Sequence, residues 1–121
     1  MTLLTAIEKA NALRPNAFDD AMKADWIIGL EAEIAEMMHK DRPCKEYEDP
    51  ENTYPSDKEL LMPYPHDGFY VPYLCAMIDE ANEETELYQD DMTIATVERQ
   101  NACSWWWRNN RPVKPKYIRG L

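Results

Sequence analysis

The sequence contains few glycines and no long apolar run. Only 3 of its 121 residues are glycine, too few for the many tight turns of a β-sandwich. No apolar stretch approaches the roughly 18 residues that span a bilayer. The opening residues, MTLLTAIEKA, lack the basic region and continuous apolar segment of a signal peptide. We therefore expect a helical protein that is soluble and intracellular.

Residue types that support catalysis or metal binding are also scarce. The 3 cysteines are far apart and show no CxxC or Cys/His ligand spacing: Cys44, Cys75 and Cys103. His39 lies near Cys44, but we interpret it as a cation in the last turn of a helix. His66 and Asp67 could ligate a metal, yet a pair without further ligands is more typical of a turn. Phosphate-binding loops and hydrolase motifs are absent from the sequence. We expect no enzymatic activity, metal site or cofactor.

Positive charge is limited relative to negative charge. Thirteen basic residues face 23 acidic ones, which gives a net charge of −10. Such a chain repels nucleic acids and anionic membranes unless its charges are segregated by face. We expect no membrane association and no specific binding of nucleic acid.

Apolar residues recur with helical spacing in four segments of a single domain, residues 1–121. The predicted helices are 2–14, 20–40, about 67–81 and 84–109. Thr2 is the expected N-cap of the first, and Asp19 or Asp20 that of the second. Pro72 is tolerable only in the first turn of the third helix. The predicted fold is all-α, a small four-helix bundle with a long C-terminal helix.

Two segments lack this spacing. Residues 41–58, DRPCKEYEDPENTYPSDK, are polar and contain three prolines, which predicts a long flexible loop between the second and third helices. Residues 59–63 could form a short extended segment. Residues 111–121 form a basic tail, and Pro112 and Pro115 prevent the last helix from continuing through it.

The last predicted helix ends with three consecutive tryptophans, Trp105–Trp107. Successive helical residues are about 100° apart, so three in a row cover about 200° of the helix surface. A small core can cover only part of that arc. At least one tryptophan should therefore face a neighbouring segment, a partner or solvent, and an amphipathic tryptophan at the domain edge is an equally good interpretation.

Residues 60–115 resemble the head–tail connector, or adaptor, proteins of long-tailed bacteriophages and Firmicute prophages. The positions that carry the resemblance are Leu60, Leu61, Pro63, Pro65, Asp67, Tyr70, Tyr73, Leu74, Ala76, Ile78, Asp79, Ala81, Asn82, Glu84, Tyr88, Met92, Trp105, Trp106, Arg108 and Pro112. LRPNAF at 13–18, followed by Trp26, extends it over nearly the whole chain. Glu83 departs from it, where the family often has a turn glycine, as do Leu87 and Pro72, where arginine and histidine are frequent.

The resemblance implies a structural virion protein and no enzyme. Such a subunit forms a dodecameric ring beneath the portal protein, extends the DNA channel and offers a platform to the tail or stopper protein. The chain would reside in the host cytoplasm during assembly and then in the virion. An acidic channel lining would also let DNA pass without gripping its phosphates.

Two surfaces are candidates for these contacts. Aromatic side chains that could serve a neighbouring subunit are Tyr64, Phe69, Trp105 and Trp107. The basic tail is the candidate contact with the portal, through Arg111, Val113, Lys114, Lys116, Tyr117, Ile118 and Arg119.

Other functions remain open. The acidity would also suit a soluble binding protein, such as a DNA mimic or an inhibitor of a host factor. That function calls for acids over one continuous face, whereas Glu31, Glu33 and Glu36 straddle the apolar stripe of the second helix. A small cysteine or metal hydrolase is a third possibility, but the sequence lacks the ligand residues that such an active site requires.

Overall fold

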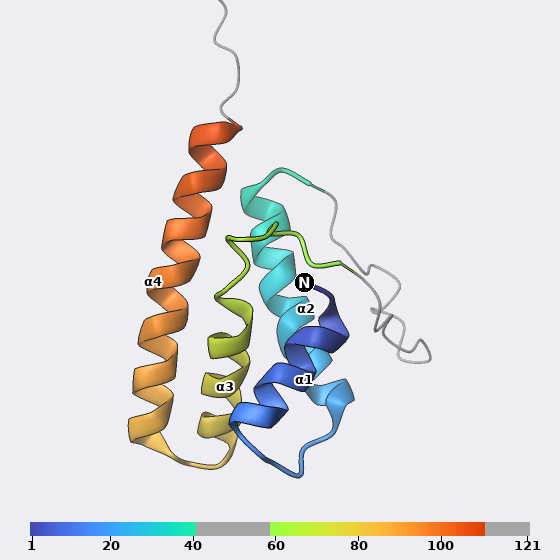
Figure 1. Cartoon of the computed structure of the whole chain (residues 1–121), viewed down its shortest axis with the longest axis vertical. Helices are drawn as coiled ribbons and strands as arrows, with labels where there is room; N and C mark the ends of the chain where they lie inside the picture. The colour runs from blue at the N-terminus through green and yellow to red at the C-terminus, as the bar shows by residue number, and fades with distance from the viewer. Residues whose placement is uncertain (41–58, 111–121) are drawn as a thin grey trace, which may run out of the picture.

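The computed structural model describes residues 1–40 and 59–110, and over these residues the fold is all-α, as predicted. The helices are α1 (Leu3–Leu13), α2 (Asp20–Met37), α3 (Tyr70–Ala81) and α4 (Thr85–Asn109). Successive helices run antiparallel, and the C-terminal end of α4 extends beyond the other three (Figure 1). The predicted loop, 41–58, and the predicted tail, 111–121, lie outside the described residues.

Helix α1 begins and ends where its sequence predicts. The Thr2 side chain accepts a hydrogen bond from the Thr5 amide at 3.2 Å, which confirms Thr2 as the N-cap. Leu3, Ile7 and Ala10 form its buried stripe. The helix stops before Pro15, because the residue that precedes a proline avoids the helical conformation.

Helix α2 is shorter than predicted. It ends at Met37, because His39 adopts a left-handed backbone with φ 56°. The His39 amide donates to the Glu36 carbonyl at 3.2 Å, and the Lys40 amide donates to the Ala35 carbonyl at 2.9 Å. These two bonds form a Schellman motif, so His39 follows the helix and is not in its last turn. At the other end Asp19 holds the N-cap position, but its side chain makes no capping hydrogen bond.

Helix α3 begins at Tyr70, a little later than predicted, because residues 64–69 form turns. The His66 amide donates to the Pro63 carbonyl at 2.8 Å, and the peptide between Tyr64 and Pro65 is cis. Pro72 is the third residue of the helix, within the first turn that it requires. The expected extended segment is reduced to one antiparallel bridge between Thr2 and Glu59.

Helix α3 is the centre of the fold and packs against each of the other three described helices. The core is built from Leu3, Ala6, Ile7, Ala10, Ala24, Ile27, Leu30, Ile34, Met38, Leu60, Met62, Phe69, Tyr70, Leu74, Cys75, Ile78 and Ala102. Among the described helices, α4 packs closely against α3 alone. One face of α4 points inward: Ala95 and Ala102 are buried, and Tyr88, Met92, Arg99 and Trp106 are partly buried. None of the described helices has the length and apolarity needed to cross a membrane.

Candidate interaction surface

Aromatic and imidazole rings gather where α4 ends. The His66 ring stacks on Trp105 with ring centres 3.8 Å apart and planes inclined by 20°. His39, which follows α2, meets Trp107 edge to face at 6.3 Å. Tyr64 lies two residues before His66 in the same turn region. We call His39, Tyr64, His66, Trp105 and Trp107 the aromatic end of the molecule.

The four aromatics predicted for a subunit interface differ in their accessibility. Tyr64 is 85% exposed and Trp107 is 39% exposed, so both side chains are available to a partner. Trp105 is partly buried beneath His66. Phe69 is only 1% exposed and packs on the Tyr70 ring at 4.2 Å. Phe69 therefore belongs to the core of the folded chain and offers no surface for contact.

The three tryptophans point in different directions around α4, and their surroundings differ. Trp105 and Trp106 pack against the hydrophobic core, whereas Trp107 is outside it. Trp106 meets Trp107 edge to face with ring centres 5.6 Å apart. The expectation that at least one tryptophan would face solvent or a neighbour is confirmed by Trp107.

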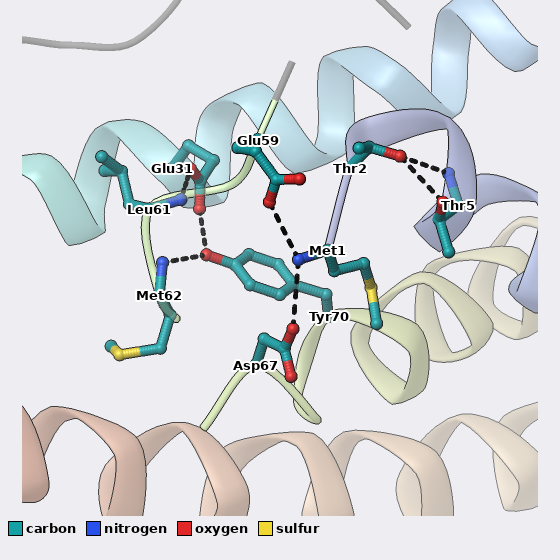
Figure 2. Close-up of polar contacts among 9 residues, drawn as sticks. All are labelled: Met1, Thr2, Thr5, Glu31, Glu59, Leu61, Met62, Asp67 and Tyr70. Atoms are coloured by element: carbon teal, nitrogen blue, oxygen red, sulfur yellow. Dashed lines mark hydrogen bonds and ion pairs between the residues drawn. The ribbon is translucent and has the colours of Figure 1, made fainter. Parts of the chain in front are cut away.

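A buried polar network holds the segment that leads to the aromatic end. Figure 2 shows the Tyr70 hydroxyl between Glu31 of α2 and the Met62 amide. The hydroxyl donates to the Glu31 carboxylate and accepts from the Met62 amide at 3.2 Å. The other Glu31 oxygen accepts from the Leu61 amide at 2.8 Å. Burial raises the pKa of Glu31, and burial also raises the pKa of Tyr70.

The same segment is tied to the first residue of the chain. The amino group of Met1 lies 3.1 Å from a Glu59 oxygen and 3.2 Å from an Asp67 oxygen (Figure 2). The Leu60 amide also donates to the Met1 carbonyl at 2.9 Å. Residues 59–62 and Asp67 are thus anchored to Met1 and to α2, which holds the turn that presents Tyr64 and His66.

A second ionic cluster lies at the opposite end of the molecule. Arg14, which follows α1, lies 3.2 Å from Asp79 of α3 and 3.0 Å from Asp91 of α4. Asp79 is fully buried, and its Oδ2 atom has no hydrogen-bond partner among the described residues. Burial and the neighbouring Asp91 together raise the pKa of Asp79 to about 6, against the lowering effect of Arg14. The geometry is that of a structural link between three helices.

The described thiols and histidines do not assemble into a reactive centre. Cys75 is buried, and burial raises the pKa of its thiol to about 11, which keeps it protonated at neutral pH. Burial also raises the pKa of Cys103. Residues 1–40 and 59–110 contain no group of three His, Cys, Asp or Glu side chains that could hold a metal ion. Cys44 lies outside the described residues.

The candidate portal contact lies outside them as well. This applies to Arg111, Val113, Lys114, Lys116, Tyr117, Ile118 and Arg119. The structure places only the point from which they follow. Asn110, the last described residue, immediately follows α4 at the aromatic end.

Sequence reasoning missed the two histidines of this surface. His39 and Trp107 are far apart in the chain, as are His66 and Trp105, and no short-range pattern joins them. The surroundings of Glu31 were missed for the same reason, because its partners come from α3 and from the segment before it. The triple tryptophan and Tyr64 were the features of the sequence that indicated a surface of interest at this end of the molecule.

Comparisons with known proteins found no match, whether among protein-family models, curated proteins or solved structures.

Proposed function

We propose that the chain is a head–tail connector subunit. In this role it forms a ring beneath a portal protein, extends the DNA channel and provides a platform for a tail or stopper protein. The support from sequence is the ordered set of residues from Leu60 to Pro112 that resembles this family. The role is structural and requires no catalytic group.

The observation that carries the proposal is the aromatic end. Tyr64 is 85% exposed. Large aromatic side chains are favoured at the centres of protein interfaces, so an exposed tyrosine at this place suits a contact with a partner. Trp107 is also exposed, and its neighbour Trp105 is held by a stacked imidazole. The backbone that leads to Tyr64 is anchored by the Leu61 amide, which donates to Glu31, and by the Met62 amide, which donates to the Tyr70 hydroxyl. A preformed aromatic surface loses little conformational freedom on binding, which favours recognition.

The charge distribution agrees with a partner contact at the aromatic end. The acids Glu80, Glu83, Glu84 and Glu86 are exposed around the turn between α3 and α4, far from the aromatic end. The basic residues of 111–121 follow directly on the aromatic end. A partner with an acidic rim would therefore be steered toward the aromatic end and not toward the α3–α4 turn.

Binding to a cognate portal protein tests the proposal. We expect the intact chain to bind immobilised portal rings, and the double substitution of Tyr64 and Trp107 by alanine to weaken binding at least about 10-fold. Deletion of residues 112–121 should abolish binding while helicity and melting stay nearly unchanged. Leu13→Ala is the matched control, because Leu13 is an exposed apolar residue at the opposite end. Full binding by both the double variant and the truncated chain would contradict the proposal.

An acidic binding protein is the second candidate. The exposed acids of the α3–α4 turn favour it, together with the net charge of −10. Such a protein would compete with DNA for a basic DNA-binding partner. Charge reversal at Glu83 and Glu84 would then weaken that competition and leave binding to portal rings unchanged.

A further inference from the structure

Helix α4 has 25 residues, and its side that faces away from α3 is exposed to solvent. Close packing against α3 covers one side only. On the remaining surface Leu87 is 40% exposed, Ile94 is 49% exposed and Val97 is 51% exposed. Around the helix, Leu87 and Ile94 lie about 20° apart and Val97 lies about 60° from Ile94, so the three share one side of α4. Exposed apolar side chains on one side of a helix are typical of a surface that binds another helix.

We propose that this face binds the same face of a second copy of the chain, with the two α4 helices antiparallel. The twofold axis would pass beside Val97, near the middle of the helix. In such a pair, a residue that precedes Val97 in one copy lies opposite the residue that follows Val97 by the same number of positions in the other copy. The inference is independent of the connector function and concerns the chain by itself in solution.

Charge is the first feature that supports this arrangement. Glu86 and Arg108 are each 11 residues from Val97, on opposite sides of it. Eleven residues correspond to about three turns, so both side chains lie within about 20° of Val97 around the helix. Both are exposed. The twofold axis therefore sets Glu86 of each copy opposite Arg108 of the other, and two complementary pairs form at the ends of the contact.

Shape is the second feature. A shallow depression of about 350 Å³ lies on one flank of α4 and is lined by Tyr88, Gln89, Met92, Thr93, Thr96 and Val97. Gln89 and Trp107 are five full turns apart, so Trp107 projects from the same flank. Its side chain leans toward the N-terminus of its own helix, as all helical side chains do. In the antiparallel pair the ring of Trp107 therefore reaches the level of the partner's depression.

The expected strength of the contact follows from its size. A helix of this length is about 37 Å long, and a contact one helix wide is small compared with the 1,200–2,000 Å² of typical specific interfaces. We therefore expect a reversible dimer with a dissociation constant of about 1–100 μM. A dimer of this kind covers Trp107, so it would compete with any other partner of the aromatic end.

Sedimentation velocity of the full-length chain, from about 1 μM to 1 mM, tests the proposal. The intact chain should pass from monomer to dimer over this range. Glu86→Arg alone sets arginine against arginine and should weaken the dimer at least about 10-fold, and Arg108→Glu alone should do the same. The double variant restores complementary pairs with reversed sign and should return the dissociation constant to within about 3-fold of that of the intact chain. Glu8→Arg on the exposed side of α1 changes the net charge equally and should have little effect.

Three results would overturn the inference: a monomer at every concentration, a self-associated species that Glu86→Arg leaves intact, or a double variant that is no better than either single one. Circular dichroism of each variant separates loss of association from loss of folding. Failure of the portal-binding experiment would leave these results unaffected, and the reverse also holds.

Discussion

Glu83 occupies a backbone position that favours glycine. Its φ is 59°, in the left-handed region, at the turn between α3 and α4. The Glu83 amide donates to the Glu80 carbonyl at 3.0 Å, and the Glu84 amide donates to the Asp79 carbonyl at 2.9 Å. These bonds define a Schellman motif whose left-handed residue is usually glycine. The resemblance to connector proteins identified Glu83 as a departure from glycine at this place.

We expect Glu83→Gly to stabilise the protein. A side chain in the left-handed conformation costs about 1–2 kcal/mol, which glycine removes. Glycine is also more flexible in the unfolded chain, which offsets about 0.5–1 kcal/mol of that gain. The net change in the free energy of unfolding should be an increase of about 0.5–1 kcal/mol. For a chain of this size the melting temperature should rise by about 2–5 °C.

Urea and thermal unfolding followed by circular dichroism measure this change. Glu83→Gln is the essential control, because it removes the charge among neighbouring acids and keeps the backbone cost. Glu84→Gly is the second control, since its φ of −93° imposes no such cost and the substitution should not stabilise. If Glu83→Gly is no more stable than Glu83→Gln, the argument from backbone conformation is refuted.

Two further predictions concern the buried polar groups. Because the pKa of Asp79 is raised to about 6 from an ordinary 3.8, its contribution to stability is fully present below about pH 4 and is lost as pH rises through about 6. Asp79→Asn should therefore stabilise the protein at pH 7.5, by up to about 3 kcal/mol, and flatten the dependence of stability on pH between 4 and 7. A denaturant series across that range measures both effects, and an unchanged slope in the variant would exclude Asp79 as its source. Tyr70→Phe should lower the free energy of unfolding by about 2–3 kcal/mol at pH 7, because it leaves a Glu31 oxygen and the Met62 amide without their buried partner. Equal stability of Tyr70→Phe and the intact chain in urea would show that this network contributes little.

The sequence predicted the helices and most of their ends: α3 ends at Ala81 and α4 at Asn109, as expected. The end of α2 and the start of α3 were each misplaced by about three residues. Thr2 is confirmed as the N-cap of α1, and the helix ends at Leu13, two residues before Pro15. Helix α2 ends through a left-handed histidine and α3 through a left-handed glutamate. The turn at Glu83 was indicated by the resemblance, which places a glycine there. The turn at His39 was not predicted, because histidine has only a modest preference for left-handed backbone.

The candidate surface was predictable only in part. Three adjacent tryptophans must point in different directions, so exposure of one of them follows from helix geometry alone. The inward position of Phe69 and the outward position of Tyr64 depend on the turns at 64–69, which have no regular period. The contacts of His39 and His66 with the tryptophans depend on how α2 and the segment before α3 approach α4, and that arrangement is a property of the whole fold.

Electron microscopy of the chain mixed with its cognate portal tests the connector proposal most directly. The account predicts a continuous ring of additional density beneath the portal, with one copy of the chain for each of its twelve subunits. The aromatic end should lie at a contact in that ring, so that the double alanine variant of Tyr64 and Trp107 adds little or no density. Intact portal rings without added density, at saturating concentrations of folded chain, would contradict the account.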